Sequence, residues 1–169
     1  SGFMHPVSAF SSVDGLDLTV PYYWNIAPNY DATFFPRYMA KRGTQLGIEA
    51  RYLDYNFSGT TRAAYLPNDK LDNDSSRWMY QIQHQQNLGV GVSAAVNWNA
   101  VSDDFYWQDL SSRLTQTTQV QLPQQVTFNY VPTPGFISNV IFQRFQTLQT
   151  DPSQPVGIPY FFEPQINVV

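Results

Sequence analysis

The sequence predicts an all-β protein, built from the strands of an antiparallel transmembrane β-barrel, and three observations lead to this prediction. Apolar and polar residues alternate with a period of two along much of the 169-residue chain, whereas helical periodicity is weak. Turn residues interrupt this alternation at regular intervals. Charged residues make up only 13% of the chain and aromatic residues 16%, whereas an ordinary soluble domain has about 25% charged residues. Strands with one apolar face and one largely uncharged polar face would have this composition.

The alternating runs define about ten expected strands, and turn or loop sequences lie between them. Connections are expected in the WNIAPN segment (24–29), at the KRG turn (41–43), and in loops 66–76, 101–112 and 150–159. No linker divides the chain, so residues 1–169 are interpreted as a single segment. The expected strands cover residues 16–22, 30–41, 45–52, 62–65, 77–83, 90–98, 119–122, 126–130, 136–149 and 160–169.

The charges of the first six runs all lie on the parity opposite to the apolar residues. Outer-membrane strands of about 9–11 residues carry an apolar band flanked by aromatic girdles. A charge on the lipid face at mid-membrane costs about 2–4 kcal/mol, so we interpret the apolar parity as lipid-facing and the polar parity as lumen-facing. The charged residues on the polar parity are Asp17, Asp31, Arg37, Lys41, Glu49, Arg51, Arg62 and Arg77.

Two features qualify this interpretation. Alternation with a period of two does not distinguish inside from outside, so a soluble β-sandwich with the apolar face packed inwards remains an alternative. The low lysine content favours the barrel, because a soluble exterior usually carries more lysine and glutamate. Arg144 shares its parity with the apolar Val140 and Phe142, which predicts either a bulge or an interior-facing exception at that residue.

Several classes of function find no support in the sequence. No basic patch indicates nucleic-acid binding, and no run of about 18 apolar residues predicts a membrane-spanning helix. The chain contains no cysteine, and His5 and His84 have no partner at metal-ligand spacing. No nucleophile-elbow motif is present. We therefore expect no metal, no cofactor and no enzymatic activity.

Six segments, the opening SGF among them, resemble a known family in the same order along the chain. The segment VPYYWNIAPNYDATFFPRYMAKRGTQLGIEARYL (20–53) is similar to the start of the barrel domain in the family of the LPS-assembly protein LptD, also called the OstA or organic solvent tolerance family. The opening SGF resembles the junction between that family's periplasmic jelly-roll and its barrel. The other similar segments are YLPND (65–69), VSDDFYWQDLS (101–111), QRFQTLQ (143–149) and PYFFEPQINV (159–168).

This resemblance implies that the chain is the first part of a much larger outer-membrane barrel. Residues 1–14 would be the junction from a missing jelly-roll, and both ends of the chain are expected to be cut. The implied function is transport of lipopolysaccharide (LPS) and its insertion into the outer leaflet of a Gram-negative outer membrane. The implied partners are LPS, the plug lipoprotein LptE, periplasmic LPS bridge proteins and the barrel assembly machinery.

Pro21 and Pro36 are the most distinctive candidate site residues. Each lies within a regular strand pattern, although proline donates no ladder hydrogen bond and is normally confined to edges or bulges. In the family, prolines at matching positions are associated with a lateral gate between the first and last strands. The alternative is that they only protect an edge from aggregation. Asp17, Asp31, Arg37, Glu49 and Arg51 are expected to face the lumen, either to guide a phosphorylated, sugar-rich ligand or simply to pair across strands.

Two other functions remain open on sequence grounds. The chain could form a small self-contained barrel of eight to ten strands, such as a lipid-modifying enzyme or an adhesion protein. It could also form a soluble β-sandwich that acts as a binding module. Heat-modifiable migration in detergent would favour the small barrel, and monodisperse behaviour without detergent would favour the sandwich.

Overall fold

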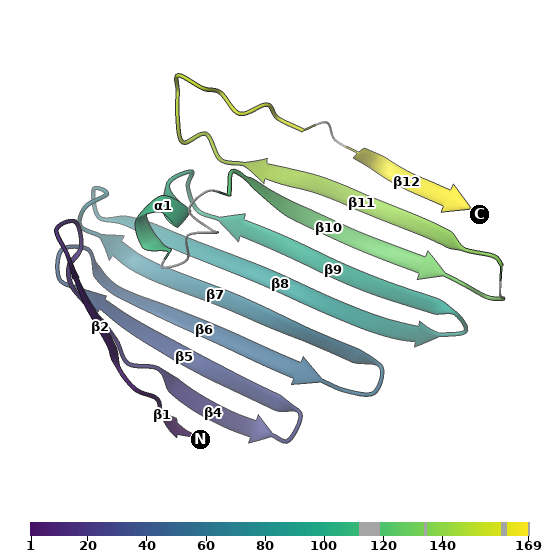
Figure 1. Ribbon diagram of the computed structural model, residues 1–169, viewed down its shortest axis with the longest axis horizontal. Helices are drawn as coiled ribbons and strands as arrows, with labels where there is room; N and C mark the ends of the chain where they lie inside the picture. Colours follow the sequence, from purple (N-terminus) through teal and green to yellow (C-terminus); the bar gives the residue numbers. More distant parts are fainter. Residues whose placement is uncertain (112–118, 134, 160–161, 169) are drawn as a thin grey trace.

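The computed structural model describes residues 1–111, 119–133, 135–159 and 162–168, and these form one antiparallel sheet (Figure 1). From β4 onwards, each strand pairs with the next one in the chain. In the described part of the chain, one short helix, α1 (Tyr106–Leu110), follows β9. The strands are β1 (Gly2–Phe3), β2 (Val7–Ser11), β3 (Gly15–Thr19), β4 (Tyr22–Ala27), β5 (Tyr30–Met39), β6 (Gly43–Leu53), β7 (Phe57–Asp69), β8 (Ser75–Gly89), β9 (Val92–Val101), β10 (Gln121–Tyr130), β11 (Ser138–Thr147) and β12 (Phe162–Val168).

The all-β, antiparallel prediction is confirmed, but closure into a barrel is not. The first strands lie at one edge of the sheet and β12 lies at the other edge (Figure 1). Within the described residues, no pairing joins these two edges. Barrel closure therefore stays a prediction.

The strand count and several boundaries differ from the sequence prediction. The described residues hold twelve strands rather than about ten. Residues 2–11 form β1 and β2, which pair with β4 and β3. The predicted strand 16–22 is divided between β3 and β4, whereas the predicted strands 119–122 and 126–130 are joined in β10. The predicted turn 24–29 is shorter, since β4 continues through Trp24 and Asn25, which pair with Ala32 and Asp31. In the same way, β7 extends to Asp69, past a register shift, and shortens the predicted loop 66–76. The predicted strand 160–169 is β12, of which 160, 161 and 169 lie outside the described residues.

The sheet has two chemically different faces. The register carries each parity across neighbouring strands, so that Leu46 lies opposite Tyr65 and Tyr65 opposite Trp78. We call this side the apolar face, because it exposes large apolar side chains. Its exposed members include Phe34, Tyr38, Leu46, Tyr65, Trp78, Phe128, Tyr130, Phe142 and Ile166.

The opposite side, which we call the charged face, carries α1. Tyr106, Trp107 and Leu110 of the helix are buried against it. These three side chains pack against buried apolar residues of the sheet, so the hydrophobic core lies beneath α1 rather than along the whole sheet. The remaining buried members of this core are Met39, Leu66, Val101, Leu122 and Leu148.

Arg144 does not have either of the two structures that its parity suggested. The ladder between β10 and β11 runs without a shift from Gln121 opposite Thr147 to Tyr130 opposite Ser138, and Arg144 lies opposite Gln124 within it. On the side of β12, the register shifts between Ile141 and Gln143. The irregularity in this strand therefore lies near Arg144 rather than at it. Arg144 projects from the apolar face in regular register with β10, so the expected interior-facing exception is wrong.

Candidate functional site

The first strands are interrupted at two prolines. β3 and β4 follow one continuous register against β5, but they are separated by Val20 and Pro21. The Val20 amide donates to the Pro36 carbonyl at 3.1 Å. The reciprocal bond, from residue 36 to the Val20 carbonyl, does not form because proline has no N–H.

Pro21 interrupts the neighbouring ladder in the same way. The Met4 amide donates to the Pro21 carbonyl at 2.8 Å, and Pro21 has no N–H with which to return a bond to Met4. The two ladders on either side of residues 20–21 therefore each lack one hydrogen bond at adjacent positions. We call this region, residues 4, 20, 21 and 36, the proline seam.

Strong contacts flank the seam on both sides. Towards α1, the Arg37 guanidinium pairs with Asp17 at 2.6 Å, and it also donates to the Leu110 carbonyl at 2.7 Å. On the other side, the rings of Trp24 and Phe34 stack with centroids 6.4 Å apart. The weak point is therefore confined to the residues around the prolines.

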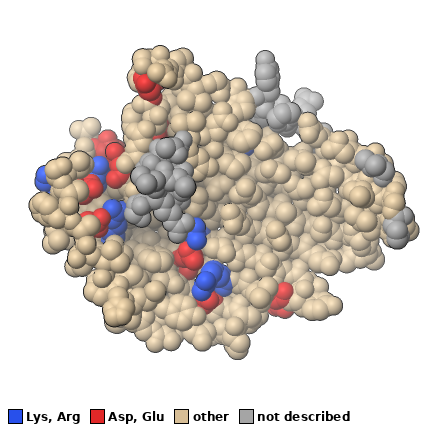
Figure 2. All heavy atoms as spheres, viewed as in Figure 1, with Lys and Arg blue, Asp and Glu red and all other residues tan. Residues whose placement is uncertain are grey.

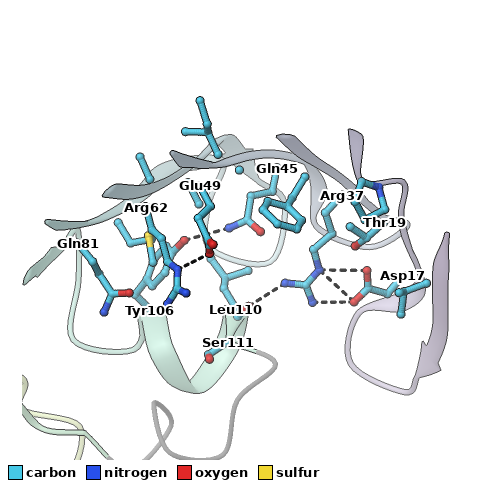
Figure 3. A pocket seen from close by; sticks show the side chains of 18 of the residues that line it. Asp17, Thr19, Arg37, Gln45, Glu49, Arg62, Gln81, Tyr106, Leu110 and Ser111 are labelled. Atoms are coloured by element: carbon cyan, nitrogen blue, oxygen red, sulfur yellow. Dashed lines mark hydrogen bonds and ion pairs between the residues drawn. The ribbon is translucent and has the colours of Figure 1, made fainter. Parts of the chain in front are cut away.

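A cavity of about 460 Å³ opens beside the seam on the charged face. Pro21, Arg37 and Glu49 line it from the sheet, and Tyr106 and Leu110 line it from α1. Figure 3 shows Arg37 pointing towards Asp17 on one side and towards the Leu110 carbonyl on the other. The same view shows Gln45 donating to the Tyr106 hydroxyl, at 3.0 Å. The helix thus lines a cavity that Pro21 of the seam also lines.

All five residues that were predicted to face the lumen project from the charged face, and each has an oppositely charged partner. Besides the Asp17–Arg37 pair, Arg51 pairs with Asp31 at 2.8 Å and Arg62 pairs with Glu49 at 2.5 Å. Figure 2 shows charges of both signs gathered around the hollow on the side of the first strands, whereas the part over β10 and β11 is almost free of charge. This arrangement agrees with the simpler of the two interpretations, in which interior charges pair across strands. Contact with a ligand stays a prediction.

Sequence analysis missed a cluster of charges that fastens α1 to the sheet, which we call the arginine latch. Arg77 is 1% exposed, and its guanidinium contacts Asp69 at 3.0 Å, Asp103 at 2.7 Å and Asp109 at 2.8 Å. Arg42 contacts Asp69 at 2.7 Å. The members of the latch are Arg42, Arg77, Asp14, Asp69, Asp103 and Asp109.

The electrostatics of the α1 segment keep the latch charged. Burial alone would raise the pKa of Asp103, but the hydrogen bonds from Arg77 and Ser102 outweigh this effect and hold its pKa below the usual value. Burial raises the pKa of the Tyr106 phenol well above its usual range. At neutral pH, Asp103 is therefore an anion that binds Arg77, and Tyr106 is a neutral phenol.

The described residues contain no group of three or more His, Cys, Asp or Glu side chains that could hold a metal ion. Among them, no helix is long and apolar enough to cross a membrane. Comparison with known proteins adds a direct observation. The family model described as LptD, LPS transport system D, matches residues 75–169, which is more than half of the chain. The chain belongs to the LptD family.

Curated relatives agree with this assignment over nearly the whole chain. The LPS-assembly protein LptD of Azoarcus sp. (strain BH72) is 44% identical over 166 residues, which cover 98% of this chain and 20% of that protein. That of Cupriavidus necator is 47% identical over 169 residues, covering 99% of this chain and 20% of the relative. The LptD of Nitrosomonas europaea is 40% identical over 172 residues, which cover 99% of this chain and 24% of that protein. The resemblance to LptD is thus confirmed, and the chain spans about a fifth of the length of these relatives.

Proposed function

We propose that this chain supplies the opening strands of an outer-membrane barrel that inserts LPS into the outer leaflet through a lateral gate. The gate is formed between these first strands, which the proline seam weakens, and the last strand of the barrel. Its membership of the LptD family supports the transport role, because the relatives are named as LPS-assembly proteins. The exposed apolar face supports contact with lipid, since soluble proteins rarely expose continuous apolar surface on this scale. The role is transport rather than catalysis, and it uses no cofactor.

The proposed organisation follows the sequence prediction. Residues 1–169 are one segment of the barrel domain, and residues 1–14 are its junction with a periplasmic jelly-roll. The partners are LPS, LptE as the plug, the periplasmic LPS bridge proteins and the barrel assembly machinery. The location is the outer membrane of a Gram-negative bacterium. Among the described residues, the two edges of the sheet do not pair with each other, which favours a part of a large barrel over a small closed barrel or a soluble sandwich.

The observation that carries the proposed gate is the alignment of the two prolines. Each one removes a ladder hydrogen bond, worth about 0.5–1.5 kcal/mol in water, and the two gaps lie beside the same residue pair, Val20 and Pro21. In lipid the loss matters more, because no water replaces the missing partner. Separation of the strands therefore costs least at this seam, where Asp17 and Arg37 hold one side and aromatic stacking holds the other.

The proposed junction gives the barrel an orientation. Residues 1–14 end at Asp14, whose carbonyl accepts a hydrogen bond from the Lys41 amide at 3.0 Å and whose carboxylate pairs with Arg42 at 2.6 Å. Lys41 and Arg42 lie in the turn between β5 and β6, and Arg42 also contacts Asp109 of α1 at 3.7 Å. Since the junction leads from a periplasmic domain, we assign the α1 end to the periplasmic side.

Photocrosslinking in the full-length protein would test the gate. A photoreactive amino acid at Val20, in the seam, is expected to capture LPS only while cells supply new LPS to the outer membrane. The matched control is Val96, which is on the same parity of the apolar face but on β9, away from the seam. Its crosslinks should come from resident LPS and persist when supply stops. Absence of LPS crosslinks at Val20, or supply-independent crosslinks equal to those at Val96, would contradict the proposed gate.

A further inference from the structure

Residues 2–11, which we call the edge segment, cover the outer edge of the first strands. In this segment, β2 pairs with β3 from Val7 opposite Thr19 to Ser11 opposite Gly15, and β1 pairs with β4. Figure 1 shows both strands along one edge of the sheet, with the N-terminus beside β4. The edge of β3 and β4 is therefore occupied by the first residues of the same chain.

The proposed gate needs this same edge. β3 and β4 pair with β5 on their other side, so the last strand of a closed barrel has to pair with the side that the edge segment covers. The outward-facing N–H and C=O groups of an edge bond to one strand at a time. The edge segment and the last strand therefore compete for β3 and β4.

The direction of the edge segment is also incompatible with an inserted barrel. The Asn25 amide donates to the Ser1 hydroxyl at 2.9 Å, so the segment begins near the turn at 28–29, and it leads to Asp14 at the α1 end. Residues 2–11 span about 30 Å along a strand, or about 20 Å in depth at a tilt near 45°. With the α1 end at the periplasmic side, Ser1 would lie towards the extracellular side, away from the periplasmic jelly-roll. This pairing therefore belongs to the protein before insertion.

Few contacts hold the edge segment in place. The side chains of Phe3 and Phe10 are 78% and 82% exposed, so they bury little apolar surface. Three residues outside the ladder, Met4, His5 and Pro6, separate β1 from β2. Short strands with little buried apolar surface are among the least stable parts of a sheet. A strand that pairs without interruption along β3 and β4 can therefore displace them.

The turn at the end of the segment is held more firmly. Asp14 pairs with Arg42 at 2.6 Å, and the Lys41 ammonium donates to the Ser12 carbonyl at 2.6 Å. Both contacts join the turn after β2 to the turn between β5 and β6, at the proposed periplasmic end. Release of residues 2–11 can therefore leave this turn in place, and the released segment then extends towards the periplasm.

We propose that the edge segment guards the edge of β3 and β4 before insertion, and that the last strand of the barrel displaces it. This inference rests on the proposed function for the last strand and for the periplasmic side. An open edge is a template for aggregation, and the first strands of a chain are synthesised before the last one. The edge segment satisfies the open edge during that interval.

The exchange keeps the proline seam as the weak point of the gate. After it, Pro21 presents its missing N–H to the last strand in place of Met4. Val7 and Ala9 of β2 line the cavity beside the seam, so the last strand takes over that part of the cavity wall. The closed gate therefore has the same gap at Pro21 as the pairing that it replaces.

Photocrosslinking from Leu18 in the full-length protein would test the exchange. Leu18 lies between Ser8 of β2 and Tyr38 of β5, and mass spectrometry would identify the crosslinked peptides. In cells depleted of the barrel assembly machinery, a photoreactive amino acid at Leu18 should capture both β2 and β5. In the inserted, heat-modifiable protein it should still capture β5, but it should capture the last strand in place of β2. The crosslink to β5 is thus an internal reference in both states.

A double proline variant should weaken the edge segment selectively. Adjacent residues of an antiparallel strand alternate in facing their partner, so Ser8→Pro with Ala9→Pro removes one N–H that bonds to β3. Loss of this bond should lower the yield of the β2 crosslink before insertion about fivefold, with the β5 crosslink unchanged. The matched control, Ser8→Ala with Ala9→Ser, keeps both N–H groups and should retain the full yield.

Two results would overturn the proposal. One is a missing β2 crosslink before insertion although the β5 crosslink is present, and the other is a β2 crosslink of undiminished yield in the inserted protein. Either result, together with supply-dependent LPS crosslinks at Val20, would contradict the guarding role alone. Exchange at Leu18 without supply-dependent crosslinks at Val20 would contradict the gate alone.

Discussion

Replacing Arg77 with methionine is expected to release α1 from the sheet and to destabilise the folded protein by about 3 kcal/mol. The Arg77 guanidinium is buried, and it joins Asp69 of the sheet to Asp103 and Asp109 of the α1 segment. Arg42 joins Asp69 to Asp109 as well, but its contact with Asp109 is longer, at 3.7 Å. Removal of one partner from a buried ion pair costs about 3–5 kcal/mol when all groups are buried. The value here is near the lower end, since Asp103 and Asp109 are about one-third exposed and Asp69 keeps Arg42 as a partner.

Chymotrypsin cleavage of the folded full-length protein would measure this release. Tyr106 and Trp107 are buried in the parent protein, so cleavage there should be slow and should accelerate in Arg77→Met. The temperature of heat modification should fall as well. Arg51→Met is the matched control, because it also removes an arginine from an ion pair on the charged face. Arg51 is 54% exposed, and exposed pairs contribute about 0–1 kcal/mol. Equal effects of the two variants would contradict a buried latch.

Restoring the missing N–H groups at the proline seam is expected to slow LPS export strongly. In the double variant Pro21→Val and Pro36→Val, each valine can return the hydrogen bond that its proline cannot, to Met4 and to Val20. Two bonds of about 1 kcal/mol each make an opening about 30 times rarer. Valine also suits a strand, since its β-branched side chain packs well on a pleated surface.

The measurement is the rate at which new LPS reaches the cell surface, together with supply-dependent crosslinking at Val20. Pro28→Ala is the control, because Pro28 lies in the turn between β4 and β5 and takes no part in a ladder. Pro28→Ala also removes a proline, so it measures how far the greater conformational entropy of the unfolded chain alone changes export. A double variant that exports at the rate of the parent protein would show that the two gaps do not limit opening.

The division of residues between the two faces could be predicted from sequence because it depends only on parity. Period-two alternation placed Asp17 and Arg37 on the side opposite Leu18 and Tyr38, and the register keeps them there. The same argument correctly placed Glu49 and Arg51. Each of these positions follows from the geometry of a single strand, so no knowledge of distant contacts was needed.

The boundaries near the first strands were harder to predict, because tertiary pairing decides them. Trp24 and Asn25 read as part of a turn, since Pro28 and Asn29 follow closely. Pairing with β5 and stacking of Trp24 on Phe34 extend the strand to Ala27. Residues 2–11 have weak alternation on their own, and they become strands only by pairing with the edge of β3 and β4.

The arginine latch could not be predicted from spacing. Its members come from the turns after β2 and β5, from the end of β7, from β8 and from the α1 segment. The only sequence signals were the charge of Arg77 on the polar parity and the acidic residues of the segment 101–111. For Arg144, parity alone predicts the correct face, which is the apolar one. The prediction became wrong when a bulge or an interior-facing exception was added to explain a charge on that face. Its partners Trp98 and Gln124 explain how a charge is held on the apolar face.

Contact between the apolar face and lipid hydrocarbon is tested most directly by spin labels at Leu46 and Phe142, which are 59% and 46% exposed. Gln83 and Gln143 on the charged face serve as matched positions. In the full-length protein in a bilayer, labels at Leu46 and Phe142 should be relaxed by oxygen dissolved in lipid and be protected from a water-soluble nickel reagent. Labels at the two glutamines should be relaxed by the nickel reagent and be little affected by oxygen dissolved in lipid. Labels at Leu46 and Phe142 that neither reagent reaches, as in a compact soluble core, would contradict a membrane barrel and with it the lateral gate.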